Sequence, residues 1–344
     1  MSCDWWLAGA SAFCFWSHPA ASSESGTSEA ASLPRRSRFL TLSPRLVSFD
    51  DPVPTSVLFR NRVPAKRRYA RPMGWTFEPG QLVPIAIVGA LYARRAWTLR
   101  RRGRPTPAWK LASFGGGLVL LLAAVVTPID SIGEERLFSV HMVQHLLIGD
   151  LAPLLLVLGL SRPLLRPLLV PRAVQRLRFL THPLVALPLW AANLWAWHLP
   201  RLYDAALDHA PVHALQHACF LAAGMLLWTT LLGLLPGPRW FGVGARLVSL
   251  GFVWVTGAAL ANIFLWSNRA FYAPYADAPR TWGLSTVADQ RVGGGVMLVE
   301  MMIVGTIVFV VLGLRWLEEA EHRQRRLEAR PRYSEPSGVP RPRG

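Results

Sequence analysis

Six of the nine histidines lie near the ends of three apolar segments: His141, His145, His198, His209, His213 and His217. If these segments cross a membrane in alternation, the six imidazoles meet at the same side of the bilayer. An imidazole is costly at the edge of the hydrocarbon unless it binds a metal, carries protons or pairs with another polar group. The grouping therefore predicts a functional site.

Two histidine pairs have the spacing of a chelate. His141 and His145, in HMVQH, are four residues apart, which places both rings on one helical face about 6 Å apart. The alternative for such a pair is one ring bonded to a neighbouring helix and the other facing headgroups. His213 and His217 repeat the spacing, and His209 extends it. Helical drift of about 40° per four residues prevents all three from aiming at one point, so we favour the deeper His213 and His217 over His209.

Other polar groups at this depth could complete a metal site. His198 ends the fourth apolar segment, in WAWHLP. Asp289 either caps the last apolar helix, or serves as an oxygen ligand or a partner of a ligand. Residues 293–295 are glycines, which let that helix approach a neighbour closely. Met142 and Met297 are packing residues or thioether ligands suited to Cu(I). We predict a metal site at His141, His145, His198, His213, His217 and Asp289, with His209, Met142 and Met297 as secondary candidates.

The composition indicates a membrane protein. Of 344 residues, 52% are apolar and 17% are charged, which is too apolar for an ordinary soluble domain. The net charge of +17 comes almost entirely from short arginine runs between apolar stretches, which excludes a nucleic-acid surface. Cys3, Cys14 and Cys219 form no CxxC, which excludes a disulfide framework and a thiolate zinc site.

The apolar stretches predict an all-α, polytopic bundle of seven transmembrane helices. Lys and Arg are concentrated in loops 94–110, 161–182 and 236–246 and in the tail, which predicts an outside N-terminus and a cytoplasmic C-terminus. The expected helices span roughly 79–97, 108–128, 138–160, 183–200, 210–234, 244–267 and 292–314.

Three parts of the chain differ in character. Residues 1–72, rich in Ser, Pro and Arg, are expected to be disordered or to be a misannotated leader, with Met73 as the start. Residues 73–316 form the membrane domain, and residues 317–344 form a polar cytoplasmic tail that begins as a helix.

Four polar residues are predicted to lie buried within the membrane domain. Asp150 and Glu300 fall inside the bilayer, where each carboxyl group must be neutral, paired or facing a polar cavity. Gln144 and Asn262 are expected to form hydrogen bonds between helices.

Three long motifs carry a family resemblance. They are HMVQHLLIGDLAPLLLVLG, the stretch from HPLVALPLW through HALQHACFLAAGMLLW, and FYAPYADAPRTWGLSTVADQRVGGGVM. In this order and spacing the sequence resembles the CtaG family of cytochrome c oxidase assembly factors, seven-span bacterial membrane proteins, over most of residues 75–314. Asp150 and the leader depart from the family pattern. The resemblance carries over to His141, His145, His198, Pro200, His213, His217, Asp289 and Gln290.

The resemblance implies a non-enzymatic role in the bacterial plasma membrane. The protein would assist copper delivery to a haem-copper oxidase at the outer face, with oxidase subunits as partners. Three alternatives remain open: an intramembrane zinc hydrolase, for which HMVQH lacks a clear general base, a bis-histidine b-haem protein, and a transporter.

Overall fold

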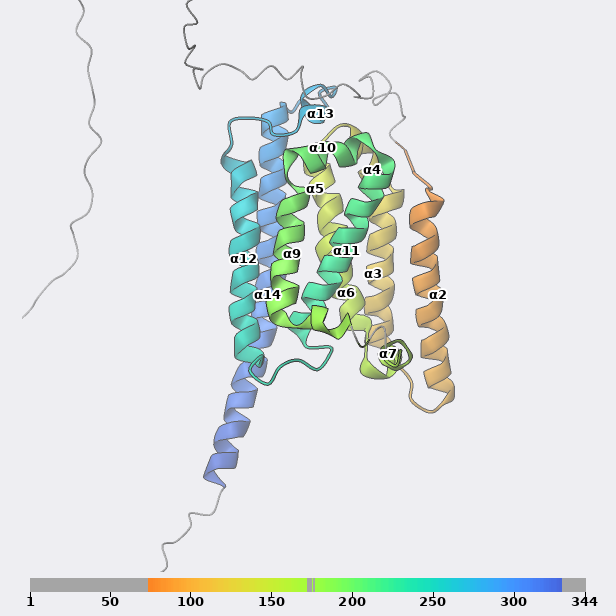
Figure 1. Cartoon of the computed structure of the whole chain (residues 1–344), viewed down its shortest axis with the longest axis vertical. Coiled ribbons are helices and arrows are strands. Elements are labelled where there is room, and N and C mark those ends of the chain that lie inside the picture. The colour runs from red at the N-terminus through yellow and green to blue at the C-terminus, as the bar shows by residue number, and fades with distance from the viewer. Residues whose placement is uncertain (1–73, 172–174, 176, 330–344) are drawn as a thin grey trace, which may run out of the picture. The chain divides into compact units, whose positions relative to one another are not determined.

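The computed structural model describes residues 74–171, 175 and 177–329 of the chain, so the predictions for residues 1–72 and for the end of the tail lie outside the described residues. The described residues form helices and no strands, and Figure 1 shows the long helices side by side in one bundle. The elements are α2 (Pro79–Arg101), α3 (Ala108–Val126), α4 (Pro128–Glu135), α5 (Phe138–Leu146), η2 (Leu147–Leu151), α6 (Ala152–Gly159), α7 (Arg162–Leu169), η3 (Leu177–Thr181), α9 (Pro183–Trp197), α10 (Pro200–Asp208), α11 (Ala210–Leu232), α12 (Val243–Trp266), α13 (Ala273–Ala276) and α14 (Thr286–Glu328).

Within the described residues, six helical stretches are long and apolar enough to cross a membrane, which makes the chain a multi-pass membrane protein. They are α2, the continuous stretch Phe138–Gly159, α3, α11, α12 and α14. The remaining predicted span, 183–200, is α9, which has only 15 residues because a new helix begins at Pro200. The seventh span and the orientation stay predictions.

The stretch Phe138–Gly159 changes its helical geometry halfway along. It is α-helical in α5 and α6, but the intervening η2 is a π-helix. Pro153 lies two residues beyond η2 and has no N–H to offer to the carbonyl of Gly149, which favours a local widening of the helix. The widened turn follows the histidine pair of α5 and contains Asp150.

Short helices that the sequence analysis did not predict cover one end of the bundle. Figure 1 shows α4, α10 and α13 lying across this end, while α7 lies at the opposite end beside α2. Each of α4, α10 and α13 has a proline in its first two positions, where the missing N–H costs nothing. Helix α14 continues past the bundle to Glu328, which confirms that the tail begins as a helix.

Small residues bring α14 close to its neighbours. A Cβ on Gly294 would lie 2.6 Å from the carbonyl oxygen of Ala261 on α12, and a Cβ on Gly293 would lie 2.6 Å from the ring of Phe138 on α5. The prediction of close approach is correct for these two glycines. Gly295, in contrast, has nothing within 4 Å of such a Cβ.

Two carboxyl groups lie inside the membrane domain, each half-buried. Asp150 and Glu300 lie near enough to influence each other, and both line one cavity. The indole Nε1 of Trp228 donates to Asp150 Oδ1 at 2.6 Å and to its carbonyl oxygen at 3.2 Å. Two neighbouring carboxyl groups inside a bilayer are too costly to ionise together, so the pair is expected to hold at least one proton.

Gln144 and Asn262 behave differently from each other. Gln144 Nε2 donates to the carbonyl of Ala124 at 3.0 Å and to Asp130 Oδ1 at 2.7 Å, which links α5 to α3 and α4 as predicted. The prediction for Asn262 is wrong, because its side-chain bonds go to Ala258 and Trp266 of its own helix.

Candidate metal centre

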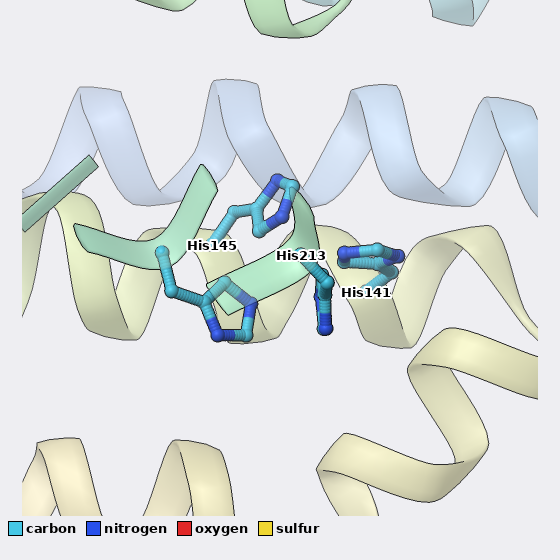
Figure 2. A group of neighbouring side chains, drawn as sticks. His141, His145 and His213 are labelled. Atoms are coloured by element: carbon cyan, nitrogen blue, oxygen red, sulfur yellow. The ribbon is translucent and has the colours of Figure 1, made fainter. Parts of the chain in front are cut away.

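Helices α5 and α11 bring four histidines together. His141 and His145 come from one helix and His213 and His217 from the other, and all four are buried. The ring centroids are 4.2 Å apart within the first pair and 4.0 Å within the second, and 5.4 Å apart between His141 and His213. Figure 2 shows the rings of His141, His145 and His213 gathered where the two helices face each other. We call these four residues the histidine cluster.

Tyr275, on α13, fixes the orientation of His141. Its hydroxyl donates to the carbonyl of Gly133 at 2.8 Å and lies 2.7 Å from His141 Nδ1. Because the only phenolic hydrogen is used for Gly133, His141 Nδ1 is the donor to Tyr275, and Nε2 keeps its lone pair. Burial raises the pKa of Tyr275, so the hydroxyl stays neutral and available.

Glu134, on α4, does the same for His213. Its Oε1 lies 2.5 Å from His213 Nδ1, which therefore carries the hydrogen. The lone pair of His213 is left on Nε2. A carboxylate behind an imidazole is a recurrent arrangement around metal ligands, because it sets the tautomer and makes the ring a better donor.

The free nitrogens of the histidine cluster converge. One candidate ligand nitrogen from each of the four rings lies within 4.8 Å of every other. Nε2 of His141 and of His213, and both ring nitrogens of His217, are buried without a hydrogen-bond partner among the described residues. Nitrogens bound tetrahedrally at about 2.0–2.1 Å lie about 3.4 Å apart, so small rotations of the side chains would close this set around one ion. The residues fit a metal with four imidazole ligands.

His198 lies beside the histidine cluster without being part of it. Its ring centroid is 6.0 Å from that of His145, and its Nδ1 donates to the carbonyl of Leu194 at 2.7 Å. Its Nε2 is buried without a partner among the described residues. His145 and His198 line a cavity of about 100 Å³, which Asp150 and Glu300 also line. His198 therefore lies outside the four converging nitrogens, and its role as a metal ligand stays a prediction.

Asp289 caps a helix, but not its own. Its carboxylate accepts hydrogen bonds from the backbone N–H of Phe138 at 2.6 Å, the N–H of Ser139 at 3.2 Å and the Ser139 hydroxyl at 2.5 Å. These groups belong to the first turn of α5, while Ser285 caps α14. The interpretation of Asp289 as a cap of the last helix is corrected accordingly. Asp289 holds the helix that carries His141 and His145.

The three secondary candidates are not among the residues whose candidate ligand atoms converge. His209 is the exposed residue that precedes α11, as helical drift predicts for the outermost of the three. Met142 and Met297 are buried, pack in the apolar core with Phe138 and Phe264, and line the same cavity as His198. Packing is the role that their contacts support.

Comparison with known proteins identifies the family. Residues 90–319 match the family described as cytochrome c oxidase caa3 assembly factor. The chain belongs to this family. It is also similar to uncharacterized proteins of Mycobacterium bovis, with 29% identity over 269 residues, and of Mycobacterium leprae, with 26% identity over 266 residues. These alignments cover 71% and 72% of this chain, which spans only 40% of the length of either relative. No solved structure matches the chain.

The sequence analysis did not identify the residues that orient the rings of the histidine cluster. Glu134 lies more than seventy residues along the chain from His213. Tyr275 lies more than a hundred residues from His141. No local spacing reveals such pairs. The only signal was that IGEER and FYAPYA supply polar groups directly next to predicted spans at the histidine end.

Asp130 adds a further buried acid near the histidine cluster, on α4. It accepts hydrogen bonds from Gln144 and, at 3.0 Å, from the Thr76 hydroxyl. Burial first, and then the negative charge of Glu134, raises the pKa of Asp130 to about 6. Asp130 thereby ties α4, which carries Glu134, to α5 through the glutamine of HMVQH.

Proposed function

We propose that this caa3 assembly factor binds copper at the histidine cluster and helps it reach a subunit of a haem-copper cytochrome c oxidase. The observation that carries the proposal is the convergence of four imidazole nitrogens within 4.8 Å, two of them oriented by Tyr275 and Glu134. Imidazole nitrogen is a good ligand for copper, and the family is one of oxidase assembly factors. Copper is the cargo in this proposal, and the protein is not an enzyme.

The geometry favours transient holding over catalysis. Four protein ligands complete a tetrahedral site, whereas a catalytic zinc site keeps one position for water. Glu134 is engaged by His213 and is not free as a general base. A porphyrin between two of these rings would need space that the other rings fill, since neighbouring centroids are only about 4.0 to 5.9 Å apart. These points weigh against the hydrolase and haem alternatives.

We further propose a seven-span topology in the bacterial plasma membrane with the N-terminus outside. In this arrangement α9 is the fourth span, and the histidine end of the bundle, with α4, α10 and α13, faces the extracytoplasmic side. The distribution of Lys and Arg supports it, because the basic loops lie at the other end. Cargo copper and the oxidase subunit that receives it would then meet at the outer face.

The test replaces His141, His145, His213 and His217 by Ala, one at a time. Each variant should lower the copper affinity of the purified protein by more than about 100-fold, which exceeds the loss seen when a residue that only hydrogen-bonds to a metal ligand is replaced. Each should also lower the copper content of the terminal oxidase in the cells. His209→Ala is the matched control, since His209 adjoins α11 but is exposed. The proposal is contradicted if the four variants bind metal as tightly as the wild type, or if the copper content of the oxidase is unchanged in all four.

A further inference from the structure

Two helix faces carry arginines toward one cavity at the end of the bundle opposite the histidine cluster. Arg95 and Leu99 lie on one face of α2, because they are four residues apart, and Arg102, the C-cap residue of α2, follows three residues later. Arg162 and Arg166 have the same relation on α7. Arg95 Nη2 donates to the carbonyl of Pro163 at 2.9 Å, which joins the two helices.

The cavity between these faces has a volume of about 830 Å³ and a strongly basic lining. Five arginines line it, namely Arg95, Arg102, Arg104, Arg162 and Arg166, and the described lining residues include no Asp or Glu. None of the five forms an ion pair with a described residue. Guanidinium groups remain charged at any ordinary pH, so their mutual repulsion is uncompensated until an anion enters. We call this cavity the arginine pocket.

The arginine pocket is also partly apolar. Leu99, which is buried, and Leu169, Val170 and Leu235 contribute to its lining. An inorganic anion gains no free energy from contact with these apolar side chains, whereas an acyl chain or a glycerol backbone packs against them.

The position of the arginine pocket is that of the bilayer interface. It lies where the apolar part of α2 ends, and exposed Trp97 and Trp109 lie on α2 and at the start of α3 near this level. Exposed tryptophans at the ends of spans lie at headgroup depth. The pocket is therefore within reach of lipid headgroups without any movement of the protein.

We propose that the arginine pocket binds the phosphodiester headgroup of an anionic phospholipid. The forked guanidinium groups match the paired oxygens of a phosphate, and basic pockets between transmembrane helices are suited to such headgroups. The apolar residues contact the start of the acyl chains. The site is separate from the histidine cluster, and its occupation does not depend on copper.

The experiment uses the full chain, reconstituted in phosphatidylcholine vesicles with and without phosphatidylglycerol, and measures the lipid that stays bound after purification. The wild type should retain phosphatidylglycerol over phosphatidylcholine by at least about tenfold. Arg102→Gln combined with Arg166→Gln should abolish this preference. Arg239→Gln combined with Arg326→Gln removes the same charge from exposed positions outside the pocket and should leave it unchanged.

Two further arms make the outcome decisive. Arg102→Lys with Arg166→Lys keeps the charge but not the fork, and should retain only part of the preference, which shows that a folded pocket with weaker donors binds less lipid. Inorganic phosphate is added as a competitor. Displacement of the bound lipid by free phosphate at equal concentration, or an equal loss of lipid preference in the pocket and control pairs, overturns the proposal.

Discussion

The histidine cluster and the Asp150–Glu300 pair are two buried polar groups in one membrane domain, and they are satisfied in opposite ways. Asp150 accepts from the indole of Trp228, and its carboxyl group has Glu300 as its neighbour. One candidate ligand nitrogen from each ring of the histidine cluster instead converges with the others, and the free nitrogens have no hydrogen-bond partner among the described residues.

The difference indicates different purposes. Two neighbouring carboxyl groups can share a proton, and with the Trp228 donor they fix helices in a medium that offers no water. Converging nitrogens without partners are the kind of set that a cation would stabilise. Asp150, Glu300 and, of the histidine cluster, His145 line one cavity. Variants that affect one group and spare the other test this contrast.

The largest effect is expected from Trp228→Phe. The change leaves Asp150 Oδ1 without its indole donor inside the bilayer, which should lower the free energy of unfolding by about 2 kcal/mol while copper affinity stays the same. Thermal melting of the purified protein measures the first effect, and copper titration measures the second.

Trp254→Phe is the matched control for Trp228→Phe. Trp254 lines the same cavity, but its Nε1 makes no hydrogen bond to a described residue, so only the smaller ring should count. A loss of stability as large as that of Trp228→Phe would show that ring volume, and not the bond to Asp150, is what matters.

Tyr275→Phe should affect the histidine cluster and leave the Asp150–Glu300 pair unchanged. The change removes the acceptor that fixes His141 and should weaken copper binding about tenfold, the lower end of the effect of outer partners. Tyr272→Phe removes an equally buried hydroxyl whose bond goes to the carbonyl of His198, and it should leave copper affinity unchanged. Equal copper affinities in the two variants would mean that Tyr275 does not orient a ligand.

Over one pH unit, the smallest effect is expected for Asp130, as a pH dependence of the free energy of unfolding. Because its folded pKa, about 6, lies above the unfolded value of 3.8, the stability that it contributes is complete below about pH 4 and is lost as the pH rises toward and through 6. The slope is on the order of 1 kcal/mol per pH unit within that window. Asp130→Asn should abolish this slope relative to the wild type in melting experiments. A wild-type and a variant curve that run parallel between those pH values would contradict the shifted pKa.

The elements were predicted well wherever the pattern was long and apolar. Six predicted spans match long apolar helices to within a few residues at most ends, because about 20 apolar residues in a row have few other stable arrangements. The short helices α4, α7, α10 and α13 were missed, since a segment of four to nine residues has too few turns for a readable period. The length of α9 was overestimated because Pro200 begins a new helix and does not continue the old one.

The sequence by itself determined which residues could meet. The spacing of four in HMVQH and HALQH fixed two imidazole pairs on helix faces, and alternating helices placed both pairs at one side of the bundle. Only the tertiary structure decided that α5 and α11 face each other, that His198 lies beside the cluster, and that Asp289 caps α5. Those facts depend on which helices pack together, and contacts between residues far apart in the chain leave no local period to read.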